Sequence, residues 1–313
     1  MSKINTVFQI IKRNPFDLWK TLFTKASKRG WLNFLSDKTF LRIQYKAKFG
    51  RKLNLEYPQT YNEKLQWLKL YDRNPEYHQM VDKYEAKKFV ANRIGEQYII
   101  PTLGVWDYVE DIDMQSLPHQ FVLKTTMGGG NLGVVICKDK SQFDEENAKS
   151  KLRKSLKEDI FWYSREWPYK GNKNRIIAES YLVDNKTNEL RDYKFFCFNG
   201  EVKALFVASE RTKKPKPYFD YFDANYQHLD LRQRYKNAPT PPEKPTCFEL
   251  MKSLASELST GIPQVRVDMY EANGKVYFGE MTFFSFGIGE VFEPEDWDRI
   301  FGDWIQLPNE KRT

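Results

Sequence analysis

Val265–Glu280 has the sequence VRVDMYEANGKVYFGE and runs directly into MTFFSFGIG at 281–289. Apolar and polar residues alternate on both sides of an Ala-Asn-Gly tripeptide, which predicts two antiparallel strands joined by a tight turn. Arg266, Asp268 and Glu280 stand among the apolar positions of these strands. An ordinary hairpin carries Thr or Val at such positions, so the three charges indicate a functional site.

Whether these charged side chains meet depends on the turn, because residues two apart share one face of a strand. A two-residue Asn273-Gly274 turn would put Asp268 and Glu280 on opposite faces. A three-residue loop that starts at Ala272, with Gly274 left-handed, would instead gather four side chains on one face: Arg266, Asp268, Glu280 and Thr282. Two carboxylates that converge beside a cation repel each other unless they share a divalent metal, and such oxygen ligands suit Mg²⁺. A charged face turned to solvent is the alternative, but Phe283-Phe284 and the SFGIG that follows favour a pocket wall.

A second segment, FVLKTTMGGGNLGVVICKD at 121–139, predicts a strand, a glycine loop and another strand. Lys124 ends the first strand, and three consecutive glycines form the loop, namely Gly128, Gly129 and Gly130. Glycine lets backbone N–H groups approach phosphates closely, so the loop is typical of a phosphate-covering flap. The β-branched run 134–136 follows in place of a helix, which excludes a Walker loop and a dinucleotide fingerprint. A glycine-rich hairpin tip without a ligand is the alternative.

The remaining pattern predicts an α+β fold with mostly antiparallel strands, because helices and strands do not alternate as βαβ units. Thr60 and Glu63 form a capping-box pair that opens one helix, and a second helix starts near Asp82 and stops at Gly95. Further strands are expected at 175–183 and on both sides of an Asn199-Gly200 turn. Another helix, CFELMKSLASELSTG, leads into the Val265–Glu280 hairpin.

Composition limits the class of protein. The 313 residues include three Cys and three His, which are scattered and therefore predict neither a zinc site nor a disulfide framework. A reducing cytoplasm fits this cysteine usage. No apolar run reaches the roughly 18 residues of a membrane span, and we expect no signal peptide at the start of the chain.

Positive charge is concentrated in an N-terminal arm, since residues 1–52 hold 13 Lys/Arg against 2 Asp/Glu. Its apolar residues recur at helical spacing before and after Pro15: Ile4, Val7, Phe8, Ile11, Phe16, Trp19, Leu22 and Phe23. We expect the apolar face to dock on the body of the protein. The alternative is peripheral contact of residues 1–52 with an anionic membrane, at its cytoplasmic face. Nucleic acid is not expected as a partner, because no motif of a nucleic-acid-binding module is present.

Taken in order, these segments resemble the ATP-grasp superfamily, in the arrangement of its D-alanine–D-alanine ligase branch. The resemblance is carried by Asp82-Lys83 at a helix start, FVLK with the glycine flap, IIAESYL, and Arg266-x-Asp268 followed by Glu280-x-Thr282. More closely, NEKLQWLKLYD, DKYEAKKFV, PTLGVWD, DYKFFCFNG, VRVDMY and VYFGEMTF resemble the TupA-like, teichuronopeptide-synthesis-type family of ATP-grasp proteins. This resemblance covers roughly residues 40 to 313.

The resemblance implies a role for each matching residue. Lys83 and Lys124 would hold the phosphates of ATP beneath the flap of Gly128, Gly129 and Gly130. Glu179 and the Leu182 backbone would meet adenine, and Asp192 the ribose. Asp268, Glu280 and Thr282 would bind Mg²⁺, although Thr282 stands where the superfamily usually has asparagine. Arg266 would stabilise the reacting oxyanion, and Ser285 and Gly287 would bind the nucleophile. The superfamily's further lysine has no clear match, so Lys194 or Arg211 would replace it.

The resemblance also implies four regions: a basic helical arm (1–55), a substrate-side α/β region (56–118), an ATP-grasp lobe with the flap (119–185) and a second lobe with the metal-binding hairpin (186–313). The implied activity is ADP-forming ligation of an amino acid or amino alcohol to a uronic acid of a capsular or surface polysaccharide, or of its lipid- or nucleotide-linked precursor. The cationic stretch RTKKPKP at 211–217 would receive this acidic saccharide.

Two alternatives to the ligase stay open. A glycosyltransferase of polysaccharide biosynthesis would use an Asp-x-Asp metal motif, and Asp111-Ile112-Asp113 and Asp296-Trp297-Asp298 match that string. A non-catalytic, ATP-binding scaffold of a capsule assembly complex is the second alternative.

Overall fold

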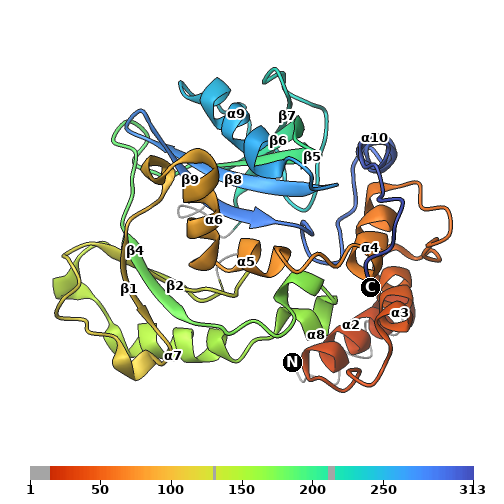
Figure 1. Cartoon of the computed structure of the whole chain (residues 1–313), viewed down its shortest axis with the longest axis horizontal. Coiled ribbons are helices and arrows are strands. Elements are labelled where there is room, and N and C mark those ends of the chain that lie inside the picture. Colours follow the sequence, from red (N-terminus) through yellow and green to blue (C-terminus); the bar gives the residue numbers. More distant parts are fainter. Residues whose placement is uncertain (1–14, 130–131, 211–215) are drawn as a thin grey trace.

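The computed structural model describes residues 15–129, 132–210 and 216–313, with the backbone alone for 15–20 and Lys28 (Figure 1). Its strands form two antiparallel sheets, as the α+β prediction requires. The four-stranded sheet has the order β1-β4-β2-β3, and the five-stranded sheet has the order β7-β6-β5-β8-β9. Figure 1 shows the two sheets one above the other, with α6 between them at one side.

The four-stranded sheet contains the predicted flap segment. Its strands are β1 (Thr102–Trp106), β2 (Phe121–Thr125), β3 (Val134–Cys137) and β4 (Ile176–Ser180). Helix α7 (Glu145–Leu156) packs against β2 and β3, and together they bury a separate apolar core that includes Phe121, Leu123 and Leu152. β1 lies in the region predicted as 56–118, yet it pairs with β4 of the region predicted as 119–185.

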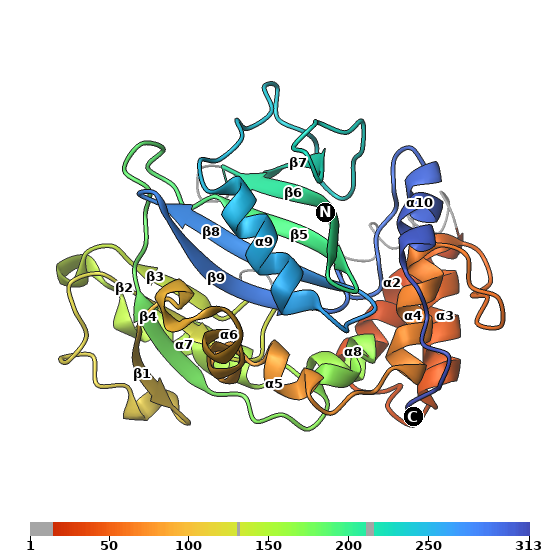
Figure 2. The same ribbon diagram turned by 45° about the horizontal axis from the view of Figure 1, so that its top comes forward.

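The five-stranded sheet supplies the second half of the fold. Its strands are β5 (Asp192–Phe198), β6 (Glu201–Ser209), β7 (Tyr218–Asp223), β8 (Val265–Ala272) and β9 (Lys275–Thr282). Helix α9 (Phe248–Ser259) lies across one face of this sheet, against β5, β6 and β8 (Figure 2). Phe248, Met251, Ala255 and Leu258 are its buried apolar stripe. The Asn199-Gly200 turn between β5 and β6 has positive φ at both residues, as predicted for this strand pair.

The β8–β9 hairpin brings the charges together without the three-residue loop that this convergence was expected to need. Asn273 and Gly274 have φ of 53° and 74°, and Ala272 pairs with Lys275, so the turn has two residues. The register then shifts between Asp268 and Met269, because Gly279 is an extra residue in β9. Beyond this β-bulge Asp268 faces Glu280 and Arg266 faces Thr282. The predicted convergence is therefore confirmed, and a bulge in place of a three-residue loop produces it.

The helices that flank the sheets begin where local chemistry favours them. The predicted capping box is present at the start of α4 (Tyr61–Tyr71), where the Thr60 side chain accepts the Glu63 N–H and Glu63 bonds back. The helix expected near Asp82 is α6 (Glu85–Ile94), and it ends before Gly95. Asp82 Oδ1 accepts hydrogen bonds from the N–H groups of Tyr84 and Glu85. These N–H groups lie at the start of α6 and have no acceptor within the helix.

The smaller helices join these layers. They are α5 (Tyr77–Val81), α8 (Ile160–Ser164), α10 (Asp296–Trp304) and the 3-10 turns Glu96–Tyr98, Val109–Asp111, Lys140–Gln142 and Trp167–Tyr169. α10 packs on α4, and α8 lies near α2.

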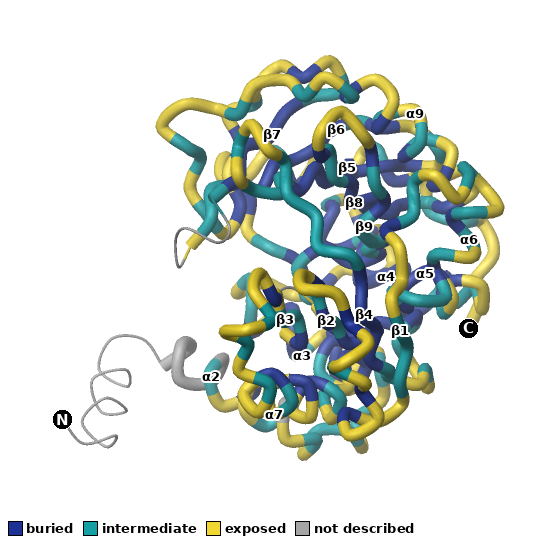
Figure 3. The backbone as a smooth tube through the Cα atoms, turned by 90° about the vertical axis from the view of Figure 1, so that its left-hand side faces the viewer, coloured by how far each residue is buried: buried dark blue, intermediate teal, exposed yellow. Residues whose placement is uncertain are grey.

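Two helices represent the N-terminal arm in the described residues, α2 (Pro15–Lys28) and α3 (Asp37–Phe49). Phe23 is buried and its ring lies 5.4 Å from that of Phe40, so α2 docks on α3. The helical pattern over Ile4 to Ile11 and the side chains of Phe16 and Trp19 lie outside the description. Figure 3 shows how burial is distributed along the backbone, with most of the strands of the larger sheet buried. Within the described ranges no helix is long and apolar enough to cross a bilayer.

Candidate functional site

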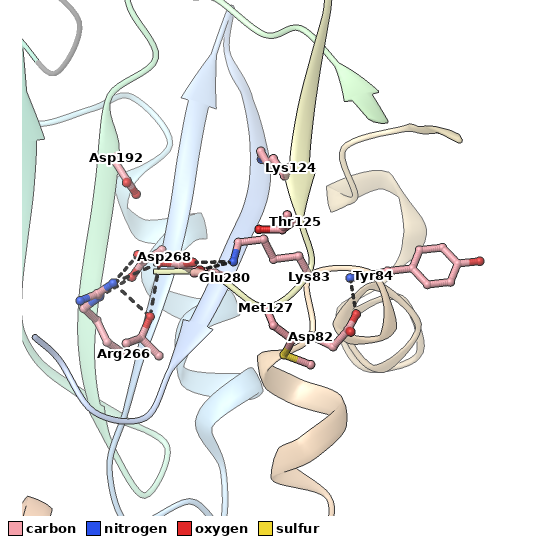
Figure 4. A network of polar contacts seen from close by, with 12 residues as sticks. Asp82, Lys83, Tyr84, Lys124, Thr125, Met127, Asp192, Arg266, Asp268 and Glu280 are labelled. Carbon is pink, nitrogen blue, oxygen red and sulfur yellow. Dashed lines mark hydrogen bonds and ion pairs between the residues drawn. The ribbon is translucent and has the colours of Figure 1, made fainter. Parts of the chain in front are cut away.

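The centre of the candidate site is a buried ion pair on β8 (Figure 4). Arg266 Nε and Nη2 donate to the two oxygens of Asp268, at 2.6 and 2.7 Å. Asp268 is completely buried, and this two-point contact fixes the plane of both groups. The two residues share a face of β8 because they are two positions apart, as the sequence predicts.

A lysine on the neighbouring strand completes this ion pair. β5 pairs with β8 so that Lys194 stands opposite Asp268, and its ammonium group contacts the Asp268 carboxylate directly. Lys194 Nζ also lies 2.7 Å from Asp192 Oδ2. Of the two candidates for the further cation of the superfamily, Lys194 therefore lies in the site. Arg211 falls outside the described residues.

The partner strand β9 adds two oxygen-bearing side chains. Arg266 Nη2 lies 3.3 Å from Glu280 Oε1 and donates to the Thr282 hydroxyl at 3.0 Å. The Thr282 hydroxyl lies 3.4 Å from Glu280 Oε1. The Glu280 side chain is 30% exposed, whereas Asp268 has no exposed surface. Glu280 is thus the more accessible of the two carboxylates that face each other across the hairpin.

Lys83 connects the two sheets. Its Nζ donates to the carbonyl oxygen of Gly128 in the flap at 2.5 Å and lies 3.9 Å from Glu280 Oε2 (Figure 4). The Lys83 N–H also donates to Thr126 O, which anchors the segment before α6 to the end of β2. A cation from the helical side therefore lies between the flap and the facing carboxylates.

A second charged cluster lies on the smaller sheet. Lys124 Nζ is 2.5 Å from Glu179 Oε2, and Lys87 Nζ is 2.6 Å from Glu179 Oε1. Lys124 and Glu179 come from β2 and β4, which are hydrogen-bonded neighbours. Lys87 was not among the predicted site residues. Its spacing of four from Lys83 on a predicted helix was the available signal, because residues at i and i+4 share a helix face.

The charges shift the pKa values of these side chains in opposite directions. Burial alone would raise the pKa of Glu280, but Lys83, Lys194 and Arg266 lower it to about 2. Burial raises the pKa of Asp268 against the pull of Arg266 and Lys194. Burial lowers the pKa of Lys83, and Glu280 opposes that change. The site therefore holds an ionised Glu280 that faces the space between the sheets.

The remaining predicted residues lie around this centre. Ser285 Oγ accepts a hydrogen bond from Arg266 Nη1 at 3.2 Å. Leu182 follows the end of β4 and is partly buried. In the flap, a Cβ on Gly128 would lie 3.2 Å from Leu132 O and a Cβ on Gly133 would overlap Ser155 Oγ, whereas Gly129 has open space. Close packing therefore requires glycine at Gly128 and Gly133. Gly130 lies outside the described residues.

Gly287 adjoins two buried charged residues, Lys69 and Glu166, that no sequence motif marks. Lys69 Nζ donates to Gly287 O at 2.8 Å and to Ser164 O at 2.9 Å. A Cβ on Gly287, whose φ is 69°, would lie 3.3 Å from Glu166 Oε1. Burial lowers the pKa of Lys69 to about 8, against the effect of Glu166. Lys69 and Glu166 thus form the wall of the site behind the turn that follows β9.

The donor set of this site suits a magnesium ion that shares a phosphate ligand, with Glu280 partly exposed and Asp268 buried in contact with Arg266 and Lys194. Two carboxylates and a hydroxyl supply hard oxygen atoms on one face of the hairpin. In the part of the chain that the structure describes, no group of three or more His, Cys, Asp or Glu side chains could hold a metal. Mg²⁺ is commonly bound by one or two carboxylates together with phosphate oxygens, which is the situation that this donor set provides.

One family model matches most of the chain. The model of the family described as TupA-like ATPgrasp matches residues 63–306. The chain belongs to the TupA-like ATP-grasp family. The match begins in α4, so α2 and α3 precede the part that the TupA-like model covers. None of the curated proteins matches the chain.

Solved structures similar to this TupA-like protein include D-alanine–D-alanine ligase from Bacillus anthracis, with 17% identity and a TM-score of 0.39 over 66% of this chain. N5-carboxyaminoimidazole synthetase from Staphylococcus aureus, complexed with ADP, has 14% identity and a TM-score of 0.42 over 74% of this chain. The chain covers 57% of the first protein and 53% of the second, less than two thirds of either. The D-cycloserine synthetase DcsG has 15% identity and a TM-score of 0.41, with 74% of this chain and 70% of that chain covered.

Proposed function

We propose that this protein is an ATP-dependent carboxylate–amine ligase that forms an amide, ADP and phosphate through an acyl phosphate. The observation that carries the proposal is the facing pair Asp268 and Glu280, held beside Arg266 and Lys194 and directly across from the flap. Phosphoryl transfer depends on positioning and on neutralising the charge of the phosphates, and these side chains are suited to both tasks.

In this proposal the nucleotide lies between the two sheets. Lys83 and Lys124 hold its phosphates, and Gly128 and Gly129 cover them. The Leu182 backbone and Glu179 meet adenine, and Asp192 meets the ribose. Asp268, Glu280 and Thr282 hold Mg²⁺, which when bound neutralises charge on the phosphate oxygens and orients them. Lys87 keeps the Glu179 carboxylate in place through their 2.6 Å contact.

Two bond exchanges follow. A carboxylate oxygen of the donor attacks the γ-phosphorus, the bond to the β-phosphate oxygen breaks, and ADP leaves. The amine nitrogen then attacks the acyl carbon, the carbon–oxygen bond to phosphate breaks, and the nitrogen releases a proton. Arg266 stabilises the oxyanion that develops in the second step, because its guanidinium is fixed by Asp268 and Ser285 before the substrates arrive. Ser285 and Gly287 line the approach of the amine.

For the substrates, we propose a uronic acid of a capsular or surface polysaccharide, or of its precursor, and an amino acid or amino alcohol. Membership of the TupA-like family supports this choice, through the resemblance to teichuronopeptide synthesis. The cationic stretch assigned to the saccharide, at 211–217, is described only from Lys216 onward.

The structure does not support a glycosyltransferase, because an aspartate of each Asp-x-Asp motif forms hydrogen bonds that stabilise its local backbone. Asp298 Oδ1 accepts the Asn62 N–H at the start of α4, and Asp298 pairs with Arg51 at 3.0 Å. Asp113 Oδ1 accepts the N–H groups of Gln115 and Ser116 in a surface turn. Neither motif is left with two carboxylates that converge on a metal. A non-catalytic, ATP-binding scaffold would keep the same cations, so turnover separates it from the ligase.

The test is to incubate the protein with ATP, Mg²⁺, a glucuronate-type carboxylate panel and an amine panel. The ligase predicts ADP together with a new amide. Release of UDP from a sugar nucleotide would support the transferase in its place. ATP that binds without turnover across the panels would support the scaffold.

A further inference from the structure

The turn that follows α2 exposes two large aromatic side chains from a rigid backbone. Gly30 N donates to Ser27 O, Asn33 N to Gly30 O and Leu35 N to Leu32 O, at 3.0 to 3.2 Å. Leu32 and Leu35 pack against the main core, whereas Trp31 and Phe34 are 63% and 82% exposed. Leu32 and Leu35 of the turn thus pack inward, while Trp31 and Phe34 remain exposed to solvent.

The exposed side of α2 continues this surface. Phe23 and Ser27 form its buried side, and Leu22, Lys25 and Arg29 lie at helical spacing on the other side. Leu22 is 55% exposed. The Arg29 guanidinium lies 5.0 Å from the centre of the Trp31 ring, which joins the helix and the turn into one surface. We call Leu22, Lys25, Arg29, Trp31 and Phe34 the aromatic–basic surface.

The charge around the aromatic–basic surface has one sign. Residues 25–52 contain nine Lys/Arg and one acid, Asp37. Asp37 is occupied within the fold, since Arg73 lies 2.6 Å and Arg165 3.4 Å from its oxygens. Among the described residues, neither Lys25 nor Arg29 forms an ion pair, and the same holds for exposed cations of α3 such as Lys38 and Arg42. The positive charge is therefore available to an anionic partner.

We propose that the aromatic–basic surface docks on an anionic lipid bilayer. Tryptophan and phenylalanine side chains enter the headgroup region of a bilayer, and lysine and arginine beside them attract acidic headgroups. The aromatic–basic surface has side chains of both kinds. A single exposed aromatic residue needs no explanation. Two of them on a hydrogen-bonded turn, one stacked under an arginine, in a segment with nearly no acids, have the chemistry of a membrane surface.

The position of this surface connects it to the candidate site. Arg165 Nη2 donates to Leu32 O in the turn at 3.2 Å. The next residue, Glu166, approaches Gly287 in the wall of the site. Docking would hence hold that wall close to the headgroup level, where a membrane-borne saccharide could reach it. This consequence rests on the proposed function, whereas docking itself does not.

The experiment measures co-sedimentation of the full-length, nucleotide-free protein with vesicles. We expect binding to phosphatidylcholine vesicles that contain about 30% phosphatidylglycerol, and weak binding to pure phosphatidylcholine, because the attraction depends on acidic headgroups. Lys25→Gln/Arg29→Gln should lower the vesicle affinity on the order of 25-fold, at about fivefold per lost cation. Trp31→Ser/Phe34→Ser should lower it at least about tenfold through loss of the interfacial aromatics.

Matched controls change the same residue types elsewhere. Tyr108→Ser removes an aromatic ring that is 68% exposed in an acidic neighbourhood, and Lys154→Gln/Lys157→Gln removes two exposed cations. Both should bind vesicles like the unaltered protein. Equal loss in the controls, or no binding to the anionic vesicles, would overturn the proposal.

Two other occupants of this surface have distinct results. A second copy would appear as a dimer in sedimentation equilibrium that Trp31→Ser/Phe34→Ser dissociates, without vesicle binding. Binding that survives Trp31→Ser/Phe34→Ser but is lost in Phe8→Ser/Ile11→Ser would assign the contact to the segment before α2. Either result contradicts docking by the aromatic–basic surface. The vesicle experiment contains no nucleotide, so a failure to bind vesicles would not bear on the ligase proposal. That proposal is tested separately by the formation of ADP and an amide.

Discussion

The two sheets carry charged clusters of opposite balance. On the smaller sheet, Lys87 and Lys124 share one carboxylate, Glu179. On the larger sheet, Arg266 and Lys194 stand among three carboxylates: Asp192, Asp268 and Glu280. Lys83 lies between the two clusters. The first cluster therefore suits anionic phosphates, and the second suits a divalent cation. A metal–nucleotide complex matches the two clusters together and neither one alone.

The largest effect is expected for Glu280→Gln, which removes the accessible carboxylate of the second cluster. ADP formation should fall by about 10³-fold, because several kcal/mol of charge stabilisation through the metal are lost. Because Lys83, Lys194 and Arg266 stabilise the ionised side chain, the free energy of unfolding at neutral pH should fall as well, so activity is compared for the folded fraction. Steady-state ADP release measures the loss. Glu271→Gln, on the same hairpin, is the control and should keep full activity; equal loss there would remove the special role of Glu280.

Lys194→Gln should lower kcat by about 10²-fold, as the loss of one charged group that stabilises the reacting phosphate does. The control is the same change at Lys203, which pairs with the exposed Glu201 on the neighbouring strand and should be neutral when altered. Rapid-quench measurement of ADP formation distinguishes this chemical effect from slow product release. A Lys194→Gln variant with unchanged kcat would show that Arg266 alone supplies the cation of the second cluster.

Gly279→Ala tests whether the bulge keeps the second cluster together. A Cβ at Gly279 would lie 2.9 Å from the Tyr270 ring and 3.0 Å from Asp268 O, so the backbone has to shift. We expect a loss of about 1–2 kcal/mol in the free energy of unfolding. ADP formation should fall about tenfold, because small displacements of reacting groups are costly. Gly274→Ala, at the exposed tip of the same hairpin, should cost stability but preserve activity in the folded fraction.

This bulge also marks the limit of prediction from the sequence. Alternation and the Asn-Gly turns predict both hairpins of the larger sheet, and the Thr60–Glu63 pair predicts the start of α4, because these signals act within a few residues. The register beyond Met269 depends on one glycine that resembles any other strand residue. Lys194 is predicted only as one of two replacements for the superfamily's further lysine, and the pairing of β5 with β8 places it beside Asp268. Lys87 reaches Glu179 only through contact between segments distant in the chain. For Lys69 and Glu166 no local pattern exists, since tertiary packing alone brings them to Gly287.

The first cluster should respond more weakly than the second. Lys124→Gln is expected to raise the KM for ATP about tenfold, by loss of one charge-assisted contact to a phosphate. Lys87→Gln should raise it by less than about threefold, because Lys87 is already bound to Ile100 O and Thr102 Oγ1 and acts through Glu179. Initial-rate measurements at varied ATP decide the order. A larger effect for Lys87 would reverse the roles of the two lysines.

The smallest effect is a pH dependence of stability in the second cluster. Despite its burial, the pKa of Glu280 is lowered to about 2 by Lys83, Lys194 and Arg266. A lowered folded-state pKa stabilises the protein above the ordinary value of 4.5, and this contribution is lost as the pH falls from there towards 2. In urea unfolding without Mg²⁺ or nucleotide, the unaltered protein should lose stability more steeply than Glu280→Gln in this range. Parallel slopes would mean that the three cations do not act on Glu280.

The most direct test of the central claim, that the two clusters receive a metal–nucleotide complex between them, is a crystal structure with ADP and Mn²⁺. Anomalous scattering locates the manganese without ambiguity. We expect a manganese peak within coordination distance of Asp268 and Glu280, with the nucleotide phosphates beside Lys83 and Lys124. A manganese ion bound away from both carboxylates, or a nucleotide outside the space between the sheets, would contradict this claim.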